Sequence, residues 1–198
     1  MAPDPNYSKL LDQQGTKFIQ TVVGIFLYYA RAFDPTMLRA LNEISRIQAR
    51  PTKDTMAKAK WFLDYDATHP NAIIRYHARK MVLHIDSDAA YIVMPEARSL
   101  YAGSFYISDW PRDKPNLPST KRNGPILTTY KTIRNVVSSD AEAETTGTFF
   151  NAKEGVDILP SLIGFGHKQP PTPLKTDNST TDGFVNYSTK PKNSRHGT

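Results

Sequence analysis

The chain has 198 residues, 39% hydrophobic and 22% charged, which is ordinary for a globular protein with one domain or a domain plus a smaller appendage. It contains no cysteine, which excludes disulfides, cysteine-ligated zinc and a thiol nucleophile. The net charge of +6 suits a polyanionic partner, although many proteins without one are as basic. The longest apolar stretch, Val22 to Ala30, is about half as long as a membrane-spanning helix. The N-terminus does not resemble a signal peptide. We therefore expect an intracellular chain that is neither secreted nor membrane-bound.

Residues 1–75 predict three short helices that pack on one another. Thr16 is the candidate N-cap of the first helix, and Asp34 followed by Pro35 begins the second, which should end near Arg50. Thr52 caps the third helix, which ends in the segment ATHPNA. The aromatic residues of this region are interpreted as packing residues and not as platforms for stacking bases: Trp61, Tyr28 and Tyr29.

Beyond residue 75 the pattern changes to that of strands. The segments IIRYH and KMVLHIDSD show period-two spacing, and the first strand is predicted to end at Asp88. Residues 99–108 and 124–134 are the second and third strand candidates, separated by a loop rich in proline and basic residues. Three consecutive strands joined by loops predict an antiparallel meander.

A helix follows the meander. Ser139 and Glu142 have the spacing of a capping box, which gives Glu142 a structural role at the helix start. Glu144 points about 200° away from Glu142 around the helix axis, so the cap does not use it. Pro160 should kink or end this helix.

A fourth strand over residues 174–176 ends at Asp177, and its crossover is long enough to lay it parallel to the first strand. If the two strands are neighbours, Asp88 lies beside Asp177, and Glu144 in the first turn of the helix reaches the same point. The alternative is that these acids are ordinary capping and turn residues. Converging carboxylates need cations to neutralise them, and oxygen ligands without His or Cys favour Mg²⁺ or Mn²⁺. Such a cluster can hold the two metal ions that cleave phosphodiesters.

The order and spacing of these motifs resemble the RNase H region of a copia-type retrotransposon polyprotein, preceded by the tail of its reverse transcriptase. The resemblance covers roughly residues 13–186 and is carried by GIFLYYARAFDPTMLRALNEIS, PTKDTMAKAKWFLDYDATHPNAIIRYH, VLHIDSDAAY, SSDAEAE and KTDNSTTDGFVN. It implies an α/β fold with an RNase H-like mixed sheet, the meander plus a parallel strand, and flanking helices. It also implies that Asp88, Glu144 and Asp177 are catalytic ligands of Mg²⁺ or Mn²⁺, with an RNA–DNA hybrid or another nucleic acid as the partner.

The resemblance divides the chain into a helical, reverse-transcriptase connection-like region over residues 1–75 and an RNase H-like domain over residues 76–198. The family's fourth acid is expected at about the point where the sequence reaches Thr198, so we expect the domain to be C-terminally incomplete. The implied function is metal-dependent endonucleolytic cleavage of RNA in RNA–DNA hybrids, impaired by the truncation. The alternative is a catalytically inactive retroelement remnant that only binds nucleic acid or serves as a structural module.

Three further features leave alternatives open. Asp86 lies on the same strand face as Asp88, and it either adds charge to the metal cluster or, as we favour, lies solvated at its rim. His84 on that face is either a ligand or, as we favour, a hydrogen-bonded histidine of the core or edge. Four basic loop residues are either phosphate contacts or ordinary solvated charges: Arg112, Lys114, Lys121 and Arg122.

Overall fold

The chain divides into two compact units in a computed structural model that describes residues 8–94, 97–110 and 122–186. The first is a helical unit within Asp4–Ile74, and the second is a sheet unit from Arg75 onward. Within the described ranges, no helix has both the length and the apolar character needed to cross a bilayer.

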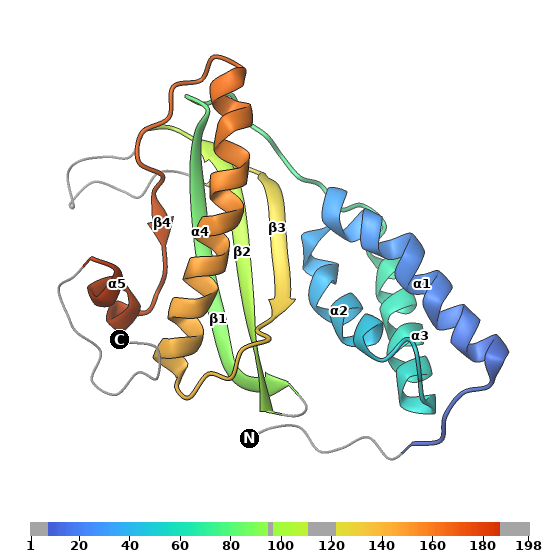
Figure 1. The fold of residues 1–198 in the computed structure, drawn as a ribbon. Coiled ribbons are helices and arrows are strands. Elements are labelled where there is room, and N and C mark those ends of the chain that lie inside the picture. Colours follow the sequence, from blue (N-terminus) through green and yellow to red (C-terminus); the bar gives the residue numbers. More distant parts are fainter. Residues whose placement is uncertain (1–7, 95–96, 111–121, 187–198) are drawn as a thin grey trace. The chain divides into compact units, whose positions relative to one another are not determined.

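The described part of the helical unit consists of α1 (Gln13–Ala32), η1 (Pro35–Met37), α2 (Leu38–Arg46) and α3 (Lys53–Thr68) (Figure 1). The three α-helices each contribute a fully buried residue to its core, Ile19, Leu41 and Ala59. Phe26 and Phe62 pack edge to face there, with 5.0 Å between their ring centroids. Most helical stability in proteins comes from the packing of an apolar face, so the burial of these apolar stripes is what stabilises the three helices.

Local caps set the starts of these helices, and two predicted boundaries are wrong. α1 begins earlier than expected, because Asp12 and not Thr16 is its N-cap and accepts a hydrogen bond from a first-turn N–H at 2.8 Å. Asp34 caps the next helix as predicted, but that helix is the 3₁₀ turn η1, which leads into α2. α2 ends at Arg46 and not near Arg50, because turns replace the helix before the proline that follows.

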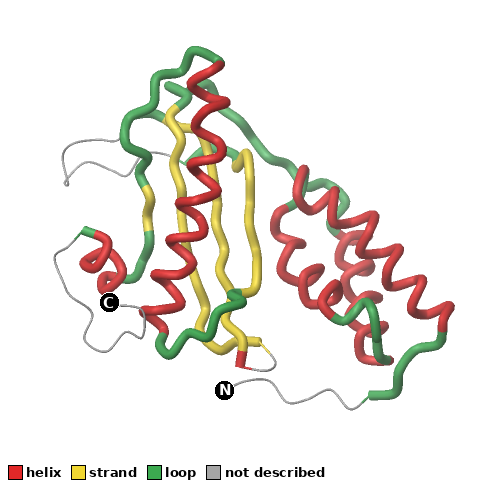
Figure 2. The backbone as a smooth tube through the Cα atoms, in the orientation of Figure 1, coloured by secondary structure: helices red, strands yellow, loops and turns green. Residues whose placement is uncertain are grey.

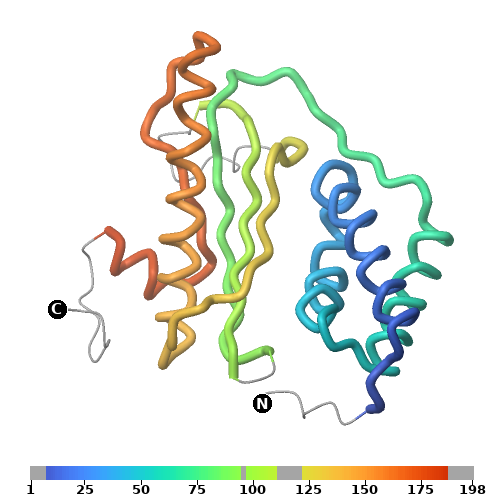
Figure 3. The backbone as a smooth tube through the Cα atoms, turned by 45° about the vertical axis from the view of Figure 1, so that its right-hand side comes forward, coloured from blue at the N-terminus to red at the C-terminus, as the bar shows by residue number. Residues whose placement is uncertain are grey.

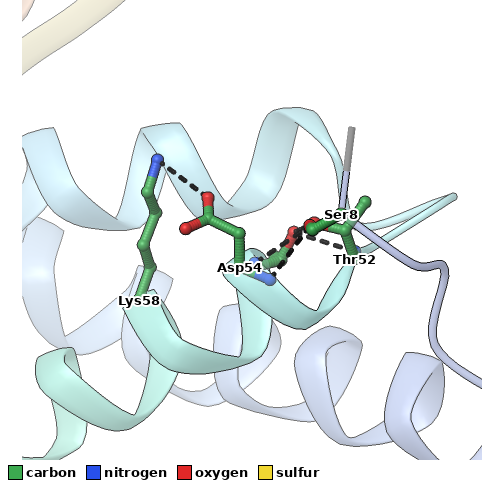
Figure 4. Close-up of polar contacts among 5 residues, drawn as sticks. Ser8, Thr52, Asp54 and Lys58 are labelled. Carbon is green, nitrogen blue, oxygen red and sulfur yellow. Dashed lines mark hydrogen bonds and ion pairs between the residues drawn. The ribbon is translucent and has the colours of Figure 1, made fainter. Parts of the chain in front are cut away.

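The start of α3 agrees with the prediction. Thr52 accepts a hydrogen bond from the N–H of Thr55 at 3.4 Å, and the Thr55 hydroxyl accepts one from the N–H of Thr52 at 3.0 Å. The N–H of Asp54 donates to the Ser8 hydroxyl at 3.3 Å, and the Asp54 carboxylate pairs with Lys58 at 3.4 Å (Figure 4). These contacts fix the first turn of α3 and tie the segment before α1 to it.

Two of the aromatic residues interpreted as packing residues lie on the surface of the helical unit. Trp61 is 84% exposed and Tyr28 is 73% exposed, so the interpretation is wrong for both. Trp61 lies about 100° around α3 from the buried Phe62, which carries the packing instead. Tyr29 is partly buried, and its ring lies 5.6 Å from that of Phe33.

The sheet unit is built around a four-stranded mixed sheet. Its elements are β1 (Val82–Met94), β2 (Arg98–Ser108), β3 (Pro125–Thr132), α4 (Asp140–Gly164), β4 (Leu174–Lys175) and α5 (Ser179–Val185). The four strands, yellow in Figure 2, are ordered β3-β2-β1-β4. The pairing is antiparallel in the β1–β2–β3 meander and parallel between β4 and β1 (Figure 1). The predicted mixed sheet, a meander plus one parallel strand with flanking helices, is confirmed.

The limits of the first strand differ from the prediction. β1 does not end at Asp88 but continues to Met94, because β2 pairs with it as far as Ala90 and, after an irregularity in register, again at Met94. The segment IIRYH, residues 73–77, is not a strand. The side chain of Asn123 bonds both the N–H and the carbonyl of His77, at 2.8 and 2.9 Å, and this replaces a strand ladder at that point.

The helix α4 packs on β1 and β2 and covers one face of the sheet (Figure 3). It runs through Pro160 to Gly164, so Pro160 does not end it. Both Pro160 and Val156 are exposed, and water can therefore reach the Val156 carbonyl that the proline leaves without its helical donor. The apolar residues between helix and sheet form two clusters, Leu83, Ile85, Phe105 and Leu162, and Tyr101, Ile133 and Ala143.

A polar side chain lies between these two clusters. Asn151 of α4 is fully buried, and its amide nitrogen donates to the Ser87 hydroxyl at 2.9 Å and the Ala102 carbonyl at 2.8 Å. Its oxygen accepts a hydrogen bond from the Thr129 hydroxyl at 3.0 Å. Gly103 of β2 makes room for this network, which holds α4 in register against all three strands of the meander.

Replacing Gly103 by alanine is expected to destabilise the sheet unit. The new Cβ would lie 2.7 Å from the Thr129 hydroxyl and closer still to the Asn151 oxygen, so the buried network must shift. We expect a loss of about 1–3 kcal/mol in the free energy of unfolding, measured by urea denaturation. Gly24→Ala is the control, because nothing lies within 4 Å of its Cβ and α1 should gain up to ~1 kcal/mol. Equal effects of the two substitutions would contradict the packing role of Gly103.

Candidate metal centre

The parallel pairing of β4 with β1 brings two aspartates together. The register pairs Asp86 with Lys175. Continuing that register by two residues places Asp177 level with Asp88 at the end of β4. The error in the predicted length of β1 does not affect this, because the position of Asp88 relative to Asp177 depends on register and not on where β1 stops.

The third acid comes from the first turns of α4. Ser139 is the N-cap and accepts a hydrogen bond from the N–H of Glu142 at 3.1 Å, as predicted. The carboxylate of Glu142 reaches back to the N–H and hydroxyl of Ser138, at 2.7 and 2.6 Å, and not to the N–H of the cap residue. Glu144 is 4% exposed and accepts a hydrogen bond from the N–H of Ala89 at 3.2 Å. The cap therefore uses one glutamate and leaves the other facing β1.

A glycine lets α4 approach the sheet closely at this end. A Cβ on Gly147 would lie 2.9 Å from that of Tyr101 and 3.3 Å from that of Ala89. Gly147 lies within one helical turn of Glu144, so this close contact sets the depth at which the Glu144 carboxylate lies beside β1.

The turn after β4 leaves Asp177 out of the cap of α5. Asn178 is the N-cap, and its side-chain oxygen accepts hydrogen bonds from the N–H groups of Thr180 and Thr181, both at 3.0 Å. The hydroxyl of Thr181 lies 3.3 Å from that of Thr145, which ties α5 to α4. The alternative of a capping role thus applies to Asn178 and not to Asp177.

The three carboxylates converge. One oxygen each from Asp88, Glu144 and Asp177 lies within 4.8 Å of the others, which confirms the convergence predicted from the sequence. Asp88 and Asp177 are exposed while Glu144 is buried. The group could hold a metal ion and is open to solvent on the side of the two aspartates.

The electrostatics of the cluster favour a bound cation. Burial raises the pKa of Glu144 from 4.5 to about 7; the hydrogen bond from the Ala89 N–H opposes this rise, and the nearby charges of Asp88, Asp177 and Asp140 add smaller increases. Burial and the charge of Asp177 likewise raise the pKa of Asp88. These acids resist ionisation together, and a divalent cation among them removes that cost.

The donor atoms fit a hard divalent cation. Oε2 of Glu144 is buried and has no hydrogen-bond partner among the described residues, although its companion Oε1 is bonded. A buried carboxylate oxygen without a partner is costly, and a cation in the cluster would satisfy it. Because all the ligand atoms are carboxylate oxygens, the set suits Mg²⁺ or Mn²⁺.

Asp86 and His84 lie outside the carboxylate group. Asp86 forms an ion pair with Arg122 at 2.7 Å, and the Tyr106 hydroxyl lies 3.5 Å from its other oxygen. Asp86 is thus not among the converging carboxylates, as favoured, but its side chain is 16% exposed and ion-paired, so the expectation that it is solvated is wrong. His84 is 2% exposed, its Nε2 lies 2.8 Å from the Asp109 carbonyl, and its ring stacks on that of Tyr106. The favoured interpretation of His84 as a hydrogen-bonded core histidine agrees with these contacts.

A cavity of about 420 Å³ joins the two aspartates of the cluster to the Asp86–Arg122 pair. Lys175 also lines this cavity, and the sequence analysis did not identify it. The sequence could have indicated Lys175, because it lies two residues before Asp177 and alternation along a strand puts such residues on the same face. Of the predicted basic loop, only Arg122 lies within the described residues, and the others lie outside them, namely Arg112, Lys114 and Lys121.

The chain matches no protein-family model and no curated protein.

Proposed function

We propose that the sheet unit is an RNase H-like nuclease domain that cleaves the RNA strand of RNA–DNA hybrids with bound Mg²⁺ or Mn²⁺. The observation that carries the proposal is the convergence of Asp88, Glu144 and Asp177 within 4.8 Å. The four-stranded mixed sheet is compatible with an RNase H-like fold. More particularly, the motifs of the sequence support a copia-type retrotransposon polyprotein as its origin, with the helical unit derived from the end of the reverse transcriptase.

The three carboxylates have distinct roles in this proposal. Asp88, Glu144 and Asp177 would hold a divalent ion, and that ion would supply charge neutralisation at the scissile phosphate and a lower pKa for the attacking water. Glu144 is buried and would hold the ion from the protein side, while Asp88 and Asp177 are exposed and would hold it on the side that is open to a nucleic-acid strand. The Ala89 N–H fixes the orientation of the Glu144 carboxylate.

The test is cleavage of a labelled RNA–DNA hybrid by the full chain in Mn²⁺, with duplex DNA of the same sequence as the substrate control. We expect RNA fragments from the hybrid only, because this chemistry selects its substrate through the 2′-hydroxyl and helix shape. Asp88→Asn and Glu144→Gln should each lower the rate at least about 100-fold, since each removes a ligand of the metal. Glu142→Gln, two residues from Glu144, should keep the rate because that carboxylate contacts Ser138 instead.

Failure of the wild-type chain to cut the hybrid, or equal rates in wild type and Asp88→Asn, would overturn the nuclease assignment. The protein would then be the inactive remnant, a module that binds nucleic acid or packs against another protein.

A further inference from the structure

The Asp86–Arg122 ion pair lies in the same cavity as the metal cluster but is not part of it. Arg122 Nε lies 2.7 Å from Asp86 Oδ2. The Asp86 side chain is only 16% exposed, while that of Arg122 is 77% exposed. The arginine therefore covers the aspartate from the solvent side and remains reachable by a ligand in the cavity.

The floor between the ion pair and the metal cluster is made of small side chains. Across the sheet, Ala102 of β2 lies opposite Asp88, and Ser104 of β2 lies opposite Asp86. Ser104 in turn pairs with Thr128 of β3. Small residues at these positions leave the cavity open along β1, from the metal cluster to the ion pair.

The charges around this floor suit a polyanion once metal is present. Among the residues that the structure describes, the basic ones that line the cavity are Arg122 and Lys175. Metal ions in the cluster would offset the charge of its carboxylates, which leaves Asp86 as the anion still facing these bases. A phosphate can take the place of that carboxylate, since both groups bind guanidinium with the same fork geometry.

We propose that Arg122 and Lys175 form a subsite for a backbone phosphate of the nucleic-acid strand beside the metal cluster, and that the Asp86 carboxylate occupies this phosphate position when no strand is bound. The subsite rests on the proposed function, because it places the neighbouring phosphate relative to the one held at the metals. Asp86 and Asp88 are separated by about 6.6 Å along β1. Adjacent phosphates of an extended strand have a comparable spacing, so one strand can reach both positions.

The experiment measures the affinity of the full chain for a short labelled RNA–DNA hybrid in Ca²⁺ as a function of salt, with intactness of the hybrid checked on a gel. Arg122→Ala should lower the affinity about five- to tenfold near 0.1 M salt and reduce the slope of log K against log salt by about 1. Lys175→Ala should act in the same direction. Lys168→Ala is the matched control, because Lys168 is an exposed base of the same unit that does not line the cavity.

Asp86→Asn tests whether the Asp86 carboxylate occupies the phosphate position, which we call the placeholder role, or is instead a metal ligand. It frees Arg122 and removes an anion, so it should tighten hybrid binding several-fold both with and without Ca²⁺. If Asp86 were a metal ligand, the substitution would instead weaken hybrid binding, and only in the presence of Ca²⁺. Thermal melts of each variant check that the fold is retained.

The outcomes distinguish this subsite from the nuclease assignment. If wild type binds the hybrid but Arg122→Ala behaves like Lys168→Ala, the subsite is wrong and the nuclease assignment stands. If Asp86→Asn weakens binding, the placeholder role is wrong. If the variants behave as expected but wild type never cuts the hybrid in Mn²⁺, the subsite stands and the nuclease assignment fails. Absence of hybrid binding by wild type overturns both.

Discussion

Millimolar Mn²⁺ should raise the melting temperature of the wild-type chain by about 5–10 °C if its concentration is about 100 times the dissociation constant. An ion that binds only the folded state stabilises it by mass action. The stabilisation should be large here because Asp88, Glu144 and Asp177 repel one another in the metal-free protein, with the pKa values of Asp88 and Glu144 already raised. Differential scanning fluorimetry with and without Mn²⁺ measures the shift.

Asp88→Asn should change both the melting temperature of the metal-free protein and the shift that Mn²⁺ produces. The metal-free variant should melt higher than the metal-free wild type, because one of the mutually repelling carboxylates is gone. Its gain from Mn²⁺ should be mostly lost, because a ligand is gone as well. Glu142→Gln is the control, because Glu142 lies in the same helical turn as Glu144 but outside the cluster; it should cost about 1 kcal/mol or less and keep the full gain. An equal Mn²⁺ shift in wild type and Asp88→Asn would show that no specific site involves Asp88.

The sequence predicts this cluster because its positions depend mostly on local rules. Capping chemistry assigns Glu142 to the helix start and thereby leaves Glu144 for another role. A short strand after a long crossover predicts a parallel neighbour for β1, and Asp177 follows from its position at the end of that strand. These inferences survive the error in the length of β1, since strand register fixes the meeting point.

Three of the errors concern contacts between residues far apart in the sequence. The Asp86–Arg122 pair joins β1 to the segment before β3, and no spacing rule relates the two positions. Strand length depends on the partner strand, which is why β1 extends past Asp88. Helical periodicity likewise does not decide which side of a helix lacks a partner, and so it does not predict the exposure of Trp61.

Metal affinity should depend steeply on pH, because Glu144 binds a proton and a metal ion at the same carboxylate. Its pKa is raised to about 7, chiefly by burial, so at pH 5 the folded protein holds this side chain neutral. Mn²⁺ must displace the proton, and its apparent affinity should therefore fall about tenfold for each pH unit below about 7. The Mn²⁺ shift in melting temperature should be small at pH 5 and reach its full value near pH 8.

The stability of the metal-free protein should fall as the pH rises, whereas the metal affinity should increase. Because the folded-state pKa of Glu144 lies above the unfolded value near 4.5, the neutral form contributes stability that is fully present below about pH 4.5. That contribution is lost as the pH rises through about 7, and the loss from this group alone amounts to about 3 kcal/mol. Protein that is kept metal-free by a chelator should thus lose stability between pH 4.5 and 7, which is the range over which Mn²⁺ binding grows stronger.

Glu144→Gln provides the matched control for both trends, because glutamine imitates the neutral carboxyl and cannot titrate. In this variant the metal-free stability should fall much less between pH 4.5 and 7, and Mn²⁺ should bind weakly at every pH. Isothermal titration calorimetry at pH 6, in two buffers of different ionisation enthalpy, should detect release of about one proton per Mn²⁺ bound by the wild type. Proton release near zero, together with equal affinity at pH 5.5 and 7.5, would mean that the ion binds elsewhere and that Glu144 is not one of its ligands.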